Sequence, residues 1–353
     1  MRIVVVSDAW FPQVNGVVRT LDTLKAELER AGHQVVMVTP DLFRSVACPT
    51  YPEIRLALAP AAKLARLIEA AQPCAIHIAT EGPLGWAARR FCRRRQLPFT
   101  SAYHTKFPEY VRARFGVPLG LSYRVMRRFH DASARVMVAT QSIENELTAR
   151  GFSRIGRWSR GVDTDLFRPR PECRGEHGPL AGLARPIFLS VGRVAVEKNI
   201  EAFLALDLPG SKVVVGDGPL ADELKRRHPE AHFVGARFGE DLARHYAAAD
   251  VFVFPSMTDT FGLVLLEALA SGLPVAAYPV PGPLDVLTGS DAGILDTDLG
   301  KAARAALALS PKACRAHAMG FSWAAATRQF LANLQPFDPA CSPDPAPHLT
   351  SMA

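Results

Sequence analysis

Paired cysteines are the first feature that this sequence lacks. Its 353 residues include six cysteines, and no two of them form a Cys-x-x-Cys pair. They are scattered at Cys48, Cys74, Cys92, Cys173, Cys314 and Cys341. This spacing argues against a disulfide framework and against a cysteine metal site, and it fits a protein of the reducing cytoplasm.

Long apolar runs are also missing. No uninterrupted run approaches the 18 or so residues that a membrane-spanning helix needs. The apolar start Ile3-Val4-Val5-Val6 is followed closely by Asp8, so it is too short for a signal peptide. We interpret it as a buried strand.

Acidic residues are scarce in the first half of the chain. Residues 1–168 contain 25 Lys and Arg against 14 Asp and Glu, a balance of +11, whereas residues 169–353 contain 16 against 20, a balance of −4. A basic first half predicts an acidic partner, such as nucleic acid, anionic lipid or a phosphorylated substrate. The overall composition, with 48% hydrophobic and 21% charged residues, excludes a disordered chain or a coiled coil.

What the sequence does contain is a regular alternation that predicts an α/β fold. Short, nearly continuous apolar runs, such as Ile3–Ser7, Val35–Thr39, Ile187–Gly192 and Val251–Pro255, are typical of strands buried on both faces. Segments with helical spacing lie between them. Strands that alternate with helices indicate parallel sheets joined by right-handed crossovers.

The length predicts about two domains, at roughly 150 residues each. The strand pattern restarts near Pro186 after a stretch rich in proline, glycine and charge over residues 168–185, which we interpret as the linker. We therefore expect two Rossmann-like domains, over residues 1–168 and 169–321. Residues 322–336 have the pattern of a terminal helix, and residues 338–353, with their four prolines, are expected to be a disordered tail.

The most informative segment contains two carboxylates eight residues apart, Asp259 and Glu267. Glu267 lies within an apolar helical pattern, so it either faces solvent or is buried for a purpose, since burying it alone costs several kcal/mol. Eight helical residues span roughly 12 Å, which approximates the distance between the two sugars of a nucleotide-sugar. The N–H groups of Phe261, Gly262 and Leu263, at the start of that helix, are candidates to hold the diphosphate between them.

This segment, with Asp-Thr-Phe-Gly over residues 259–262 and Glu-Ala-Leu-Ala-Ser-Gly over residues 267–272, resembles the signature of family 4 glycosyltransferases with the GT-B fold. It is similar to the subset that includes lipid-linked mannosyl- and glucosyltransferases. The resemblance implies two Rossmann-like domains facing across a cleft, with the terminal helix returning to the first domain. It also implies that Asp259, where the family usually has Glu, orients the donor sugar and that Glu267 binds the ribose.

Three further donor-site residues follow the family's order. Val191-Gly192-Arg193 and Glu197-Lys198-Asn199 resemble the family's phosphate-binding pair, so Arg193 and Lys198 are expected to neutralise the leaving diphosphate. Either cation alone would read as an ordinary surface charge. Gly216, in Val-Gly-Asp-Gly-Pro, is expected to line the nucleotide pocket, although a purely structural turn explains it equally well.

The first half also contains residues that the resemblance implicates. Gly16 follows the first strand and leads into a helix, where a glycine lets the backbone approach a ligand. His104 ends another strand and matches the family's histidine beside the reacting centre, although a lone histidine there is commonly structural. Arg160-Gly161-Val162-Asp163 resembles the family's hinge between the domains.

Two Asp-x-Asp triplets raise the alternative of a metal site. They are Asp163-Thr164-Asp165 and Asp296-Thr297-Asp298, and neither follows a hydrophobic strand that leads into substrate loops. We interpret both as turn residues and expect no metal and no other cofactor. The Arg193 and Lys198 pair would neutralise the diphosphate instead.

Arginines cluster in the first half, and the clusters admit two interpretations. The groups are Arg89-Arg90, Arg93-Arg94-Arg95, and Arg112, Arg114, Arg124, Arg127 and Arg128, the last interleaved with aromatic and apolar residues. This composition is typical of a surface that binds an anionic membrane, or of a solvated basic helix face. Nucleic acid is not expected, because no nucleic-acid-binding motif accompanies the charge.

The combined hypothesis is a retaining hexosyltransferase of the class EC 2.4.1.-. It would move a hexose from a nucleotide-sugar, of the GDP-mannose or UDP-glucose type, to a lipid-linked or glycan acceptor. We expect it to be cytoplasmic and peripheral on the inner membrane face. The alternatives are a sugar-nucleotide epimerase of the same fold and a non-catalytic nucleotide-sugar-binding protein.

Overall fold

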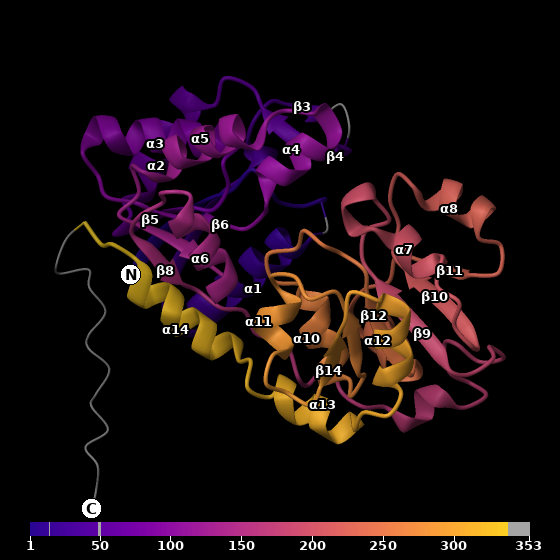
Figure 1. Ribbon diagram of the computed structural model, residues 1–353. Coiled ribbons are helices and arrows are strands. Elements are labelled where there is room, and N and C mark those ends of the chain that lie inside the picture. The colour runs from indigo at the N-terminus through magenta and orange to yellow at the C-terminus, as the bar shows by residue number, and fades with distance from the viewer. Residues whose placement is uncertain (14, 49–50, 338–353) are drawn as a thin grey trace, which may run out of the picture.

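The computed structural model describes residues 1–13, 15–48 and 51–337, which form two lobes (Figure 1). The first lobe is built on a parallel sheet of six strands in the order β2-β1-β5-β6-β7-β8. Its strands are β1 Arg2–Val6, β2 Gln34–Val38, β5 Ala75–Ile78, β6 Thr100–Tyr103, β7 Arg135–Val138 and β8 Ile155–Arg157. A hairpin of β3 (Ser45–Cys48) and β4 (Tyr51–Ala57) lies outside this sheet.

The second lobe repeats the design with the strand order β11-β10-β9-β12-β13-β14, again all parallel. The strands are β9 Ile187–Val191, β10 Ser211–Val215, β11 His232–Gly235, β12 Val251–Phe254, β13 Val275–Ala277 and β14 Gly293–Leu295. Two parallel α/β sheets confirm the predicted pair of Rossmann-like folds. In each sheet the strand order reverses next to the first strand, between β1 and β5 and between β9 and β12. Ligands of such sheets bind at the carboxyl ends of the strands beside this reversal.

Helices cover both faces of each sheet. In the first lobe they are α1 Gly16–Arg30, α2 Ala61–Ala71, α3 Pro83–Arg95, α4 Phe107–Phe115, α5 Leu119–His130 and α6 Gln141–Ala149. In the second they are α7 Ile200–Leu204, α8 Ala221–Arg227, α9 Gly239–Ala248, α10 Leu263–Ala270, α11 Pro283–Leu287, α12 Leu299–Ala306 and α13 Pro311–Ala318. Short 3-10 helices are η1 Pro40–Leu42, η2 Pro171–Arg174 and η3 Val196–Lys198. Across the described part of the chain, no helix is long and apolar enough to span a membrane.

The cysteines partly follow expectation. Cys92, Cys173 and Cys314 are free thiols. Cys74 is disulfide-bonded, although the cysteine spacing argued against a disulfide framework. The proposed tail of residues 338–353 lies outside the described residues.

The stretch predicted to be a linker packs into the second lobe instead. Phe167, Cys173 and Leu180 are buried in the same core as β9 and α9. The guanidinium of Arg170 forms two hydrogen bonds with the Glu240 carboxylate, at 2.5 and 2.9 Å. Val162 belongs to the same core, as does Ala139 of the first lobe, so this core extends across the junction of the lobes. Composition alone could not reveal that this loop-rich stretch carries apolar anchors.

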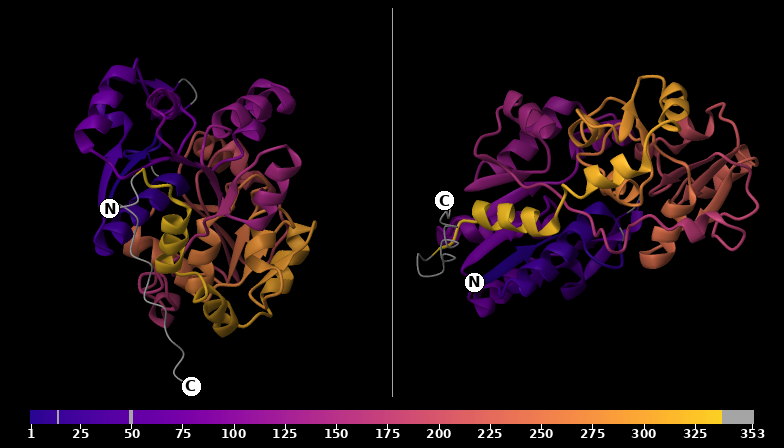
Figure 2. Two further views of the ribbon diagram at one scale, coloured as in Figure 1. Left: turned by 90° about the vertical axis from the view of Figure 1, so that its left-hand side faces the viewer. Right: turned by 90° about the horizontal axis from the view of Figure 1, so that it is seen from below.

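The last helix, α14 (Trp323–Asn333), returns to the first lobe and lies along it (Figures 1 and 2). Ala326, Phe330 and Leu334 are buried in a core shared with α1 and with Trp158. The returning chain passes close to the outgoing one, because a Cβ added at Gly161 would lie 2.2 Å from the backbone nitrogen of Trp323. The N–H of Val162 donates to the carbonyl of Phe321 at 3.1 Å in the same place.

The first prediction tests this docking. Phe330→Ala should lower the free energy of unfolding by about 3–5 kcal/mol, because it leaves a cavity beside Trp158, whose ring centroid is 5.0 Å away. Thermal and urea unfolding measure the change. Arg328→Ala, at an exposed position of the same helix, is the matched control and should change stability little. Equal stability of the two variants would show that α14 does not complete the first lobe.

Candidate active site

The loops that follow β9 and β12 bring two predicted site residues into direct contact. Lys198, in η3, donates to the carboxylate of Asp259 at 2.5 Å. Burial alone would lower the pKa of Lys198, but Asp259, with smaller contributions from Tyr110 and Glu197, raises it well above its usual value. The lysine is therefore a fixed cation, and another anion could replace the carboxylate of Asp259 as its partner.

Arg193 lies half-buried in the same loop after β9, so both expected phosphate-binding cations follow one strand. This loop packs backbone against backbone on the loop after β10. A Cβ at Gly216 would lie 1.8 Å from the carbonyl oxygen of Gly192. The N–H of Val194 also donates to the carbonyl of Asp217 at 2.9 Å. Gly216 thus has a structural role, because its lack of a side chain lets the loops after β9 and β10 come into contact.

Glu267 is buried on α10, so the alternative that it faces solvent is wrong. The hydroxyl of Tyr246 donates to its Oε2 at 2.9 Å. Arg19, which comes from α1 of the other lobe, pairs with its Oε1 at 2.6 Å. These two partners compensate the buried charge, which would otherwise cost several kcal/mol. Arg19 was not among the predicted site residues, although it lies one helical turn after Gly16.

The start of α10 differs from the expected geometry. The helix begins at Leu263, and Phe261 and Gly262 precede it, so only the second half of the Asp259–Glu267 segment is helical. Gly262 has a φ of 85° and no side chain caps the helix. The first-turn N–H groups are thus not used by a capping side chain, but the distance of roughly 12 Å that assumed a continuous helix does not apply.

His104, at the end of β6, is held by two contacts. The guanidinium of Arg160 donates to its Nδ1 at 3.1 Å, and Trp158 contacts its ring edgewise. Since arginine can only donate, Nδ1 accepts and the imidazole proton resides on Nε2. Burial, with the charge of Arg160, holds the pKa of His104 well below its usual value. His104 is therefore a neutral hydrogen-bond donor, and its Nε2 has no partner among the described residues.

Arg160, part of the predicted hinge, is buried and also fixes the tautomer of His104. The hydroxyl of Thr260, next to Asp259, donates to the carbonyl of His104 at 2.6 Å. This hydrogen bond joins the two lobes directly at the predicted reaction centre.

Tyr110, on α4, is a second residue from the first lobe that sequence reasoning missed. It hydrogen-bonds the side chain of Thr258 and lies beside Lys198 and Asp259. Burial raises its pKa to about 12, so the hydroxyl stays neutral. No local motif marks it, because its neighbours in space belong to the other lobe.

Gly16 is the first residue of α1, behind the cap formed by Asn15, whose side chain accepts from the N–H groups of Val17 and Val18 at 3.0 Å. A Cβ at Gly16 would meet no atom within 4 Å. Packing within the chain does not require a glycine there, so its predicted role in approaching a ligand remains a prediction.

The two Asp-x-Asp triplets form turns. Asp163 accepts from the N–H groups of Asp165 and Leu166, and Asp298 caps α12. Asp296 pairs with Lys301 at 2.6 Å. Within the residues that the structure describes, no group of three or more His, Cys, Asp or Glu side chains could hold a metal ion.

Comparison with known proteins agrees with this geometry. Residues 14–166 match the family model Glycosyltransferase Family 4, and residues 185–310 match Glycosyl transferases group 1. The GDP-mannose-dependent alpha-mannosyltransferase of Mycobacterium tuberculosis is 31% identical over 316 residues, which cover 84% of this chain and 83% of that one. The chain belongs to glycosyltransferase family 4.

Two further matches extend this result. The alpha-monoglucosyldiacylglycerol synthase of Streptococcus pneumoniae is 29% identical over 321 residues, which cover 80% of this chain and 72% of that one. Sucrose-phosphate synthase from Thermosynechococcus elongatus superposes with a TM-score of 0.74 at 23% identity, covering 93% of this chain and 97% of that one. The predicted family and the predicted GT-B fold are thus confirmed. The matches support a glycosyltransferase, and they do not favour the epimerase or the non-catalytic binding protein.

The second prediction separates the two acids. Glu267→Gln should weaken binding of a nucleoside diphosphate about tenfold or more, because the buried carboxylate is the expected ribose acceptor. Asp259→Asn should weaken binding of the nucleotide-sugar and leave the free nucleotide within about threefold, since it also releases Lys198 for the diphosphate. Calorimetric titration measures both.

Glu223→Gln, at an exposed acid on α8 of the same lobe, is the control for loss of charge. If Glu267→Gln and Asp259→Asn lose affinity for the free nucleotide equally, the division of roles between the two carboxylates is wrong.

Proposed function

We propose that this glycosyltransferase transfers a hexose from a nucleotide-sugar to a lipid-linked or glycan acceptor, with retention of configuration at the anomeric carbon. The observation that carries the proposal is the hydrogen bond from Thr260 to the carbonyl of His104. It holds the loop of Asp259 and Lys198, from one lobe, against the strand end of the histidine from the other. A nucleotide-sugar bound between these loops would have its sugar beside the N–H at Nε2 of His104.

The chemistry follows from charges already in place. A diphosphate would take the position of Asp259 as the partner of Lys198, with Arg193 from the same loop, and these cations would stabilise the charge that develops as the diphosphate leaves. The acceptor oxygen forms its bond to the anomeric carbon on the face from which the diphosphate oxygen departs. The departing oxygen takes the acceptor's proton. Glu267 accepts from the ribose, and Asp259 and neutral His104 orient the sugar.

A double displacement through a carboxylate nucleophile is disfavoured in this site. Such a mechanism needs a free carboxylate with a second acid about 5 Å away. Glu267 is buried and paired with Arg19, so it does not serve as the second acid that Asp259 would need. Arg193 and Lys198 make a metal unnecessary for neutralising the diphosphate, and we expect full activity in the presence of a chelator.

The relatives suggest which donors to test. One is named a GDP-mannose-dependent mannosyltransferase and another a glucosyldiacylglycerol synthase, so GDP-mannose and UDP-glucose head the screen. Asp259, one methylene shorter than the family's usual Glu, changes the position of the carboxylate that would contact the sugar. Donor consumption with and without an acceptor pool distinguishes transfer from epimerisation, because an epimerase acts on the donor alone.

The third prediction concerns the cations. Lys198→Ala and Arg193→Ala should each lower kcat about 10²–10³-fold, because each removes charge that stabilises the leaving group. Folding should change little. Lys225→Ala, at an exposed lysine of α8, is the matched control. Near-normal turnover in both site variants, or strict dependence on added divalent metal, would contradict the proposed mechanism.

We further propose that the enzyme is cytoplasmic and binds peripherally to the inner face of the membrane. Phe107 and Phe115 of α4 and Leu121 and Val125 of α5 are between 47% and 64% exposed. Arginines of α5 lie on the same exposed helix face, and an apolar surface bordered by arginine is typical of interfacial binding. Each Lys or Arg near anionic lipid contributes about 1 kcal/mol.

The fourth prediction tests this placement. Vesicles that contain anionic lipid should bind the enzyme, high salt should weaken the binding, and neutral vesicles should bind little. Leu121→Ser with Val125→Ser should reduce vesicle binding several-fold without affecting nucleotide binding. Phe238→Ser with Met319→Ser, at exposed apolar positions of the other lobe, is the control pair. Absence of vesicle binding at low salt would instead favour a soluble glycan acceptor.

A further inference from the structure

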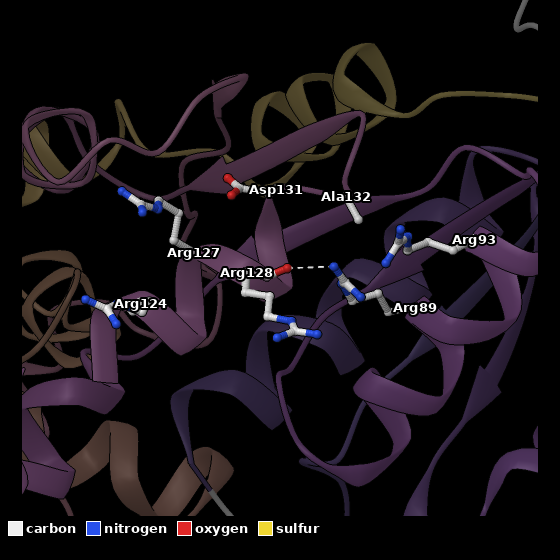
Figure 3. Close-up of a pocket in the computed structure, with 7 residues that line it drawn as sticks. All are labelled: Arg89, Arg93, Arg124, Arg127, Arg128, Asp131 and Ala132. Atoms are coloured by element: carbon white, nitrogen blue, oxygen red, sulfur yellow. Dashed lines mark hydrogen bonds between the residues drawn. The ribbon is translucent and has the colours of Figure 1, made fainter. Parts of the chain in front are cut away.

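A cavity of about 390 Å³ lies between α3 and α5, on elements that carry none of the donor-site residues. Its lining includes Arg89 and Arg93 of α3 and Arg124, Arg127 and Arg128 of α5. Figure 3 shows Arg89 and Arg93 pointing toward Arg128, whereas the guanidinium groups of Arg124 and Arg127 point away from α3. One carboxylate, that of Asp131, also lines it. The volume falls within the range of about 300–1,000 Å³ that is usual for small-molecule sites.

The cavity has a rigid base. Arg89 is buried, and its guanidinium donates to the carbonyls of Phe129 at 2.9 Å and Arg128 at 2.7 Å. It also lies over the ring of Trp86, 5.3 Å from the centroid. These contacts fix α3 against the end of α5, so the two helices that carry the other arginines are held in a defined arrangement.

The charge of the cavity is unbalanced. Arg93, Arg124, Arg127 and Arg128 form no ion pair with any carboxylate that the structure describes, and a single aspartate lines the same space. Arg95, two residues further along α3 than Arg93, does pair with Glu69, so exposed arginines on this helix can find partners. Burial, and then the charges of Arg93 and Arg128, lower the pKa of Arg89. The positive charge around the cavity therefore exceeds the single negative charge of Asp131.

The spacing along α5 connects this cavity to the proposed membrane surface. Leu121, Arg124, Val125 and Arg128 are exposed and follow one another at intervals of three or four residues, so they share a face of the helix. The cavity thus opens beside the apolar side chains that would enter the bilayer. A ligand held there would lie at the level of the lipid headgroups.

We propose that the α3–α5 cavity is a binding site for the phosphate group of an anionic phospholipid headgroup. Several unpaired guanidinium groups can form bidentate hydrogen bonds to phosphate oxygens, which a diffuse basic surface does not offer. Occupancy would fix the orientation of the first lobe on the bilayer. The proposal rests on the membrane placement proposed above and adds to it a preference for phosphate over other anions.

The experiment compares vesicles of equal surface charge. One set contains phosphatidylglycerol in phosphatidylcholine, and the other contains the same molar fraction of charged oleate in place of phosphatidylglycerol. Wild-type enzyme should bind the phosphatidylglycerol vesicles about tenfold more tightly. Arg93→Ser with Arg128→Ser should remove this preference and leave a weaker binding that is equal for both sets. Arg128 keeps its backbone contact with Arg89 in this variant.

Arg226→Ser with Arg244→Ser removes the same charge from exposed positions of the second lobe and should preserve the preference. Nucleoside diphosphate binding, unchanged in both variants, confirms that they are folded. A second arm titrates glycerol 3-phosphate without vesicles, and we expect it to bind at least tenfold more weakly than the bilayer-borne phosphate.

Equal wild-type binding to the two vesicle sets would overturn the proposal and leave the membrane placement standing. Tight binding of free glycerol 3-phosphate that Arg93→Ser with Arg128→Ser abolishes, without a vesicle preference, would also overturn it in favour of a soluble phosphate ester. Failure of wild-type enzyme to bind any anionic vesicle would instead contradict the membrane placement itself.

Discussion

A carboxylate buried on an apolar helix has to be compensated by groups from outside that helix, and in this enzyme half of the compensation comes from the other lobe. Glu267 receives a hydroxyl from Tyr246 within its own lobe and a guanidinium from Arg19 across the interface. The arrangement places α1, with Gly16 at its start, against α10. The strand order supports it, because the reversals beside β1 and β9 leave the loops at the carboxyl ends of both sheets free to meet.

Three polar groups of the predicted donor site are each held by a cationic side chain. Lys198 holds Asp259, Arg19 holds Glu267, and Arg160 holds His104. In the proposed mechanism, donor binding is an exchange of partners, in which a diphosphate replaces the carboxylate of Asp259 and ribose hydroxyls join the ion pair of Glu267. Such exchange keeps buried charges compensated in both states, so neither state bears the full cost of an isolated charge.

The sequence predicts most of the fold because its central strands are unambiguous. Runs such as Ile3–Ser7 and Ile187–Gly192 are apolar throughout, as the middle of a doubly covered sheet requires. The edge strands β8 and β14, of three residues each, carry too little pattern to be recognised. Residues next to a motif, such as Lys198 and Asp259, could be found. Arg19 and Tyr110 could not, because their partners lie in the other lobe and no local periodicity records such a contact.

The close approach of Gly161 to the backbone of Trp323 has a mechanical consequence. The chain crosses between the lobes twice, and both crossings lie side by side and are joined by the hydrogen bond from Val162 to Phe321. A single connection would permit the lobes to turn about any axis, whereas two adjacent chain segments resist torsion about their own direction more than they resist bending. A side chain larger than glycine at position 161 would push the two strands apart and remove that bias. The double connection therefore favours bending across the two segments over twisting of one lobe against the other.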